Sequence, residues 1–205
     1  MPPDTTAVLV EPFAAEPAAA TPGKLPGDLA IWFFILAELL AFAVFFAAYA
    51  FARAKNVALF NESQLTLDRH SGALNTVLLI TGSWFVVLAV QATKRDARLA
   101  AVRWLAAAMA CGFGFLAVKV MEYADKFEHG ITMSTNTFYM FYISLTFFHF
   151  MHVILGMVIL GVLLVKTWQG AYGSHEHHTL ESGAAYWHMV DLLWIVLFPL
   201  VYVMR

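Results

Sequence analysis

Five apolar segments, each long enough to cross a lipid bilayer, constrain this chain more than any other feature. A helix needs about 20 apolar residues to cross the hydrocarbon core. Five segments reach that length: 28–52, 71–93, 99–121, 137–166 and 184–204. Hydrophobic residues make up 61% of the 205 residues and charged residues 13%, which is unlike a soluble domain. The sequence therefore predicts an all-α integral membrane protein, a bundle of five transmembrane helices over 28–205.

The N-terminal segment and the basic residues predict how the bundle sits in its membrane. Residues 1–27 have no apolar core, so we expect a disordered tail before the first span, with Asp28 capping the helix. Lys94, Arg95 and Arg98 form the densest basic cluster, and such clusters collect on the cytoplasmic side. We therefore expect a cytoplasmic N-terminus, a periplasmic C-terminus and residence in a bacterial inner membrane.

Composition also argues against several classes of function. A net charge of -2 without a basic patch speaks against nucleic acid as a partner. The single cysteine, Cys111, rules out an internal disulfide and a cysteine-ligated metal cluster. Pro199 is the only proline within a span, whereas inverted-repeat transporters have helices broken by glycine and proline. This weakens, without excluding, the hypothesis of a small free-standing transporter or membrane enzyme.

Ionisable residues inside the apolar segments are the candidates for function. Each costs about 2.5 to 3.5 kcal/mol at the centre of a membrane helix, so it must face protein or water. Glu38 lies about 15 Å into the first span, and His188 and Asp191 share one face of the last. We expect these three residues at one level of the bundle. Glu38 would handle protons or contact a larger subunit, or else form a hydrogen bond that fixes packing.

Two histidines, His149 and His152, share one face of the fourth span. Haem would need facing histidines at equal depth on two helices, and a haem–copper centre would need a larger set. We therefore expect hydrogen bonds between helices here, with no metal ligand and no catalytic residue in the chain. The histidine-rich segment 175–178 is expected to be a solvated loop.

Two further patterns concern the ends of the spans. Lys119 and Glu122, three residues apart, are predicted to pair at the membrane interface, where such pairs contribute little stability. Most tryptophans lie near span ends, which predicts an interfacial aromatic belt formed by Trp32, Trp84, Trp104, Trp168, Trp187 and Trp194.

Five pieces of the sequence, in order, resemble one family of membrane subunits. The matching residues are Glu38 with Tyr49, Leu74 with Asn75 and Thr76, Glu122 with Tyr123, Phe148 with His149, His152 and Val153, and Glu181 with Trp187, His188, Asp191 and Trp194. Any one piece is a weak match, but five in order are specific. Over about 25–205 the chain resembles subunit III of the haem–copper respiratory oxidases, the cytochrome c oxidase subunit III family.

The resemblance implies a subunit without haem or copper, because the family's redox centres belong to subunits I and II. Its implied role is to dock on subunit I, stabilise the active centre during turnover, support proton uptake and bind phospholipid between its helices. Glu38 aligns with the family's carbodiimide-reactive glutamate. The polar network that organises the bundle would consist of His149, His152, His188, Asp191, Glu181 and Glu122.

With five predicted helices, the chain resembles the short branch of this family. That branch includes subunit III of bacterial quinol oxidases and the accessory proteins of nitric oxide reductase gene clusters, and the start and end of the bundle look most like the latter. A subunit of an oxygen-reducing oxidase is the leading hypothesis. An accessory subunit or assembly factor of a nitric oxide reductase is the alternative.

Overall fold

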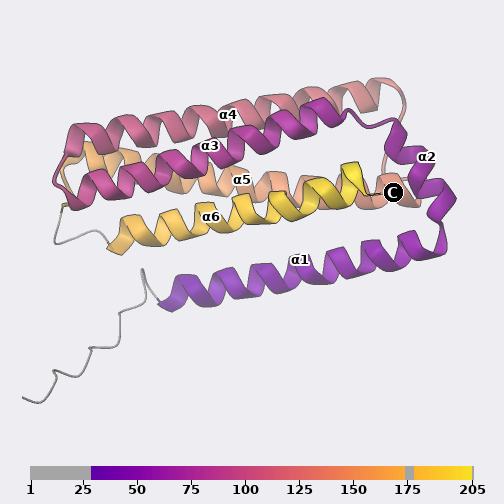
Figure 1. The fold of residues 1–205 in the computed structure, drawn as a ribbon, viewed down its shortest axis with the longest axis horizontal. Coiled ribbons are helices and arrows are strands. Elements are labelled where there is room, and N and C mark those ends of the chain that lie inside the picture. The colour runs from indigo at the N-terminus through magenta and orange to yellow at the C-terminus, as the bar shows by residue number, and fades with distance from the viewer. Residues whose placement is uncertain (1–28, 174–177, 205) are drawn as a thin grey trace, which may run out of the picture.

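The computed structural model describes residues 29–173 and 178–204, and the elements within these ranges are helical (Figure 1). Five helices are long and apolar enough to cross a membrane: α1 (Leu29–Lys55), α3 (Arg69–Lys94), α4 (Arg98–Glu128), α5 (Thr137–Gln169) and α6 (His178–Phe198). The prediction of an all-α bundle of five membrane helices is confirmed. The expected tail at 1–27, the cap at Asp28 and the loop histidines at 175 and 177 lie outside the described residues.

Two elements were not predicted from the sequence. The short helix α2 (Val57–Leu65) joins α1 to α3, and α6 continues into a π-helical turn, η1 (Pro199–Val203). Because α2 has only 9 residues and a polar run in its middle, it has no apolar period to reveal it. The membrane helices also run past the predicted spans. For example, α4 extends to Glu128 and α6 begins at His178, which was expected in a loop.

The start of α3 is fixed by an N-cap whose strength depends on pH. The Asp68 carboxylate accepts hydrogen bonds from the His70 backbone N–H at 2.9 Å and from the Ser71 hydroxyl at 2.5 Å. These bonds, that of Ser71 foremost, hold the pKa of Asp68 below its ordinary value. The stabilisation is therefore present above the carboxyl's unfolded pKa and is lost as pH falls through the lower folded pKa.

We expect Asp68→Ala to weaken the first turn of α3 by about 1 kcal/mol, the usual effect of losing an N-cap. Hydrogen exchange of the amides at the start of α3 should then be faster in the variant than in the wild type. This difference should vanish in acid, where the wild-type carboxyl is protonated. An equal difference at neutral and acid pH would contradict the capping role.

Four of the membrane helices form a closed ring, and α1 lies outside it. In the ring, α3 packs against α4, α4 against α5, α5 against α6, and α6 against α3. Figure 1 shows α1 set apart from these helices, along the side of the bundle next to α6. In the most apolar stretch of α1 only 11% of the residues are buried, whereas 56% are buried in the corresponding stretch of the last span. Most of the α1 surface is therefore free to meet lipid or another subunit.

The ring closes around one aromatic side chain of α6. The fully buried indole of Trp187 lies against Gly82 of α3, Gly112 of α4 and Gly156 of α5. We call these three glycines the glycine socket. A Cβ atom at Gly112 or Gly156 would lie 3.0 Å from this ring, and one at Gly82 would lie 3.6 Å from it. Small residues thus let three helices approach one large side chain.

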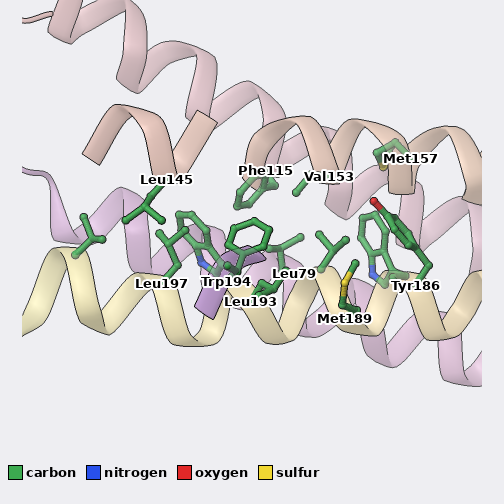
Figure 2. Packing of buried hydrophobic residues seen from close by; sticks show 14 of the residues in the cluster. Leu79, Phe115, Leu145, Val153, Met157, Tyr186, Met189, Leu193, Trp194 and Leu197 are labelled. Carbon is green, nitrogen blue, oxygen red and sulfur yellow. The ribbon is translucent and has the colours of Figure 1, made fainter. Parts of the chain in front are cut away.

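The prediction of an interfacial aromatic belt is wrong for the two tryptophans of α6. Trp187 and Trp194 are completely buried, whereas Trp168 is 69% exposed and Trp84 is 59% exposed. Figure 2 shows Trp194 among apolar residues of the other ring helices, including Leu79, Phe115 and Leu145. Its indole N–H donates to the Thr76 hydroxyl at 3.0 Å, so the polar edge is satisfied inside the bundle. Position along a span could not show which face of α6 points inward.

Candidate functional site

The first site residue, Glu38, pairs with a histidine of another helix. Its Oε2 atom lies 2.9 Å from Nε2 of His152, so the pair joins α1 to α5. The Glu38 side chain is 21% exposed and that of His152 9% exposed. The rings of Phe42 and Phe148 lie 5.3 and 4.6 Å from the His152 ring, between centroids. A carboxyl group is thus held in an aromatic setting at the flank of the bundle.

A second contact orients the imidazole of His152. Its Nδ1 atom lies 2.7 Å from the backbone carbonyl oxygen of Phe148, one turn earlier in α5. The hydroxyl of Tyr186, from α6, donates to the backbone carbonyl of His152 at 3.3 Å. The histidine is therefore fixed on both of its ring nitrogens and on its backbone.

The other histidine of the α5 pair, His149, lies deeper and has no comparable contact. It is completely buried, with its ring centroid 5.3 Å from that of Trp194 and 5.8 Å from that of Phe115. Neither ring nitrogen has a hydrogen-bond partner among the described residues. The hydrogen bond between helices that we expected at both histidines therefore occurs at His152 and not at His149.

His188 of α6 contacts a hydroxyl group of α3. Nδ1 of His188 lies 3.3 Å from the Ser83 hydroxyl. Oδ1 of the buried Asp191 has no hydrogen-bond partner among the described residues. His188 thus joins α6 to α3, while Glu38 joins α1 to α5. These two contacts are separate, and the common level expected for Glu38, His188 and Asp191 stays a prediction.

The most completely buried polar cluster was not recognised from the sequence as a core feature. The ammonium group of Lys119, on α4, donates to Glu122 Oε2 at 3.0 Å and to the Tyr202 hydroxyl at 2.6 Å. The other carboxylate oxygen of Glu122 accepts from Tyr142 at 2.6 Å and from Tyr202 at 2.7 Å. We call these four residues the lysine–glutamate cluster. Lys119 and Glu122 do pair, but inside the bundle, with side chains 0% and 5% exposed.

The rings around Lys119 explain how its charge is tolerated there. Its ammonium group lies 5.0 Å from the Trp194 ring and 5.1 Å from the Tyr202 ring. Such rings attract a desolvated cation. The sequence signal was present, since Lys119 lies three residues before Glu122 and close to Tyr123 in an apolar helix, but its burial inside the bundle was missed.

Glu181 lies at the edge of a cavity between α1, α3 and α6. It forms an ion pair with Lys94 at 2.7 Å, across the ends of α6 and α3. The cavity has a volume of about 570 Å³. Its walls are mainly apolar, and its lining includes Trp32, Leu39, Val87, Ala185 and His188 as well as the ion pair. The cavity therefore has a polar mouth and an apolar interior.

The described residues form no cluster of metal-ligating side chains. Within 29–173 and 178–204, no three or more His, Cys, Asp or Glu side chains are arranged to hold a metal ion. The polar clusters described above offer hydrogen bonds, ion pairs and groups that can hold protons.

Comparison with known proteins gives one consistent result. The family model described as cytochrome c oxidase subunit III matches residues 26–205. The cytochrome c oxidase subunit 3 of Synechocystis sp. is 33% identical over 193 residues, which are 90% of this chain and 82% of that protein. That of Thermostichus vulcanus is 31% identical over 177 residues, 86% of each chain. The family resemblance drawn from the five sequence pieces is confirmed.

A third relative is a longer protein. The heme-copper oxidase subunit I+III of Aeropyrum pernix is 31% identical over 179 residues. The match covers 84% of this chain but 22% of that protein.

Proposed function

This chain belongs to the cytochrome c oxidase subunit III family and is a subunit III of a haem–copper oxidase; on that premise we propose that it stabilises subunit I during turnover and supports proton uptake. The observation that carries the proposal is the Glu38–His152 pair, a proton-holding group placed by α1 at the flank of the bundle. The relative named subunit I+III supports contact with subunit I, because its name places both subunits in one chain. The exposed surface of α1 provides area for such docking.

We place this subunit in a bacterial inner membrane with its N-terminus in the cytoplasm. The turn between α3 and α4 carries Lys94, Arg95 and Arg98, which favours the cytoplasmic side for this end of the bundle. The cavity and its Lys94–Glu181 ion pair then face the cytoplasm. Haem and copper belong to the partner subunits in this proposal.

Purification of the chain in mild detergent, with a haem spectrum and mass spectrometry of its partners, tests the proposal. We expect the haem-bearing oxidase subunit I, together with subunit II, in stoichiometric amounts. Subunits of a nitric oxide reductase would support the alternative function instead. A colourless chain without partners would overturn both and favour a free-standing transporter.

Glu38→Gln should leave the complex assembled but shorten its catalytic lifetime or slow proton uptake. The amide still hydrogen-bonds His152, so the loss of stability should be small, whereas an amide cannot take up or release a proton as a carboxyl group does. Oxygen consumption followed until inactivation, together with proton uptake, measures the effect. Glu128→Gln, an exposed change at the end of α4, is the matched control. Unchanged kinetics and lifetime in the assembled Glu38→Gln complex would contradict a role in proton uptake.

The cavity between α1, α3 and α6 is proposed to hold a phospholipid. Its volume lies within the range of about 300 to 1,000 Å³ that is usual for ligand sites. An acyl chain would fill the apolar interior, and the headgroup would meet Lys94 and Glu181 at the mouth.

Filling this cavity should remove the bound lipid. We expect Ala185→Trp to lower the phospholipid retained after purification by one molecule per chain, as counted by native mass spectrometry. Ala43→Trp adds the same side chain to the exposed surface of α1 and should leave the count unchanged. Equal lipid counts in both variants and the wild type would show that the cavity holds no phospholipid.

A further inference from the structure

The contacts of His152 determine where one of its protons must be. Nδ1 lies 2.7 Å from the backbone carbonyl oxygen of Phe148. A carbonyl oxygen can only accept a hydrogen bond, and an unprotonated ring nitrogen can also only accept. Two acceptors do not approach to this distance without a hydrogen between them. Nδ1 therefore carries a hydrogen.

This assignment restricts the opposite side of the ring. Nε2 lies 2.9 Å from Oε2 of Glu38, and these two atoms also need one hydrogen between them. That hydrogen is either on the carboxyl, facing a neutral imidazole, or on Nε2, facing a carboxylate. Moving from the first form to the second breaks the O–H bond and forms an N–H bond with the nitrogen lone pair. The pair has no net charge in either form.

We propose that Glu38 and His152 together form a single proton-binding site, which holds one proton shared between the carboxyl group and Nε2. Neutrality explains how a carboxyl group that is 21% exposed is tolerated on a helix with so little buried surface. The inference deepens the proton-handling role proposed for Glu38 and rests on it for its biological meaning. Its geometry concerns this chain alone.

The surroundings oppose any change in the number of protons held. Loss of the proton would leave a carboxylate facing a nitrogen lone pair at 2.9 Å, and gain of a second would leave a net charge beside Phe42 and Phe148. The ionisable groups that face the pair are Tyr186 of α6, which hydrogen-bonds the His152 backbone, and His149 of α5, which interacts electrostatically with His152 and with Lys119 of α4.

Solid-state NMR of the full chain with ¹⁵N-labelled histidine, in bilayers and within its purified complex, tests the proposal. His152→Gln identifies the signals of His152 by their loss. In the wild type we expect Nδ1 to be protonated, as the neutral Nδ1–H tautomer or as imidazolium. In Glu38→Gln the amide must donate to Nε2, so we expect the neutral Nδ1–H tautomer alone.

His188 is the internal control. Its Nδ1 faces the Ser83 hydroxyl, which can donate or accept, so that contact imposes no tautomer. Its signals should not move in Glu38→Gln. An unprotonated Nδ1 on His152 in the wild type would overturn the proposal, and so would the ordinary Nε2–H tautomer in Glu38→Gln. Because these signals need no turnover, either result would leave the oxidase-subunit role intact, while failure to find haem-bearing partners would not alter them.

Discussion

Lys119→Met is expected to lower the free energy of unfolding by about 3 to 5 kcal/mol, the usual cost of removing one partner from a buried ion pair. The methionine fills much of the space, but the Glu122 carboxylate is left without its cation in a site where its side chain is 5% exposed. The hydroxyls of Tyr142 and Tyr202 still donate to it and recover part of the loss. Unfolding of the purified chain in mixed micelles with increasing SDS measures the change.

Two further variants show whether the effect comes from the unpaired charge. Lys119→Met combined with Glu122→Gln should recover most of the stability, because no charge is then buried without a partner. Lys94→Met breaks another lysine–glutamate pair, but Lys94 is 46% exposed, and exposed pairs contribute about 0 to 1 kcal/mol. Similar losses for Lys94→Met and Lys119→Met would refute the importance of burial.

Trp187→Ala is expected to lower the free energy of unfolding by about 3 to 5 kcal/mol, as is usual when a core tryptophan is truncated. The indole fills the glycine socket, and the three glycines have no side chains that could move into the empty space. The flexible side chain of Met157, which also lies against Gly112, can fill part of it, so the size of the loss within this range depends on how far Met157 moves. The same SDS titration measures it.

Trp168→Ala is the matched control, since the indole of Trp168 is 69% exposed near the end of α5. It should change the stability by no more than about 0.5 kcal/mol, as surface substitutions usually do. Xenon binding to Trp187→Ala would reveal the cavity directly, because an empty apolar cavity of this kind takes up such atoms. A loss no larger than that of the control would show that the ring closes without Trp187.

Much of the fold was predictable because the bilayer imposes a simple rule on length and composition. Apolar segments of about 20 residues identify membrane helices, and all five appear where the sequence places them. The same rule says nothing about α2, whose residues are too few and too polar, or about which helices are neighbours. The ring of α3 to α6, with α1 outside it, is a property of side-chain packing that the segment pattern does not contain.

The candidate residues were identified more easily than their partners. Glu38 and His152 were both singled out as ionisable groups in apolar helices, yet 113 residues lie between them and only the packing of α1 against α5 joins them. Burial was the second difficulty. Lys119 was expected at the membrane interface because it lies near the end of an apolar run, but α4 continues to Glu128 and the Lys119 side chain is buried against Tyr202 of η1.

The position of Trp187 and Tyr202 in the last span has a consequence for how the protein is made. Ribosomes add about 5 to 20 residues per second, so α6 is complete roughly 5 to 20 seconds after α3. During this interval α3, α4 and α5 cannot close their ring, because the side chain that fills the glycine socket does not yet exist. Lys119 and Glu122 likewise await the Tyr202 hydroxyl. During synthesis we therefore expect an open three-helix intermediate that lasts at least until translation reaches the end of α6.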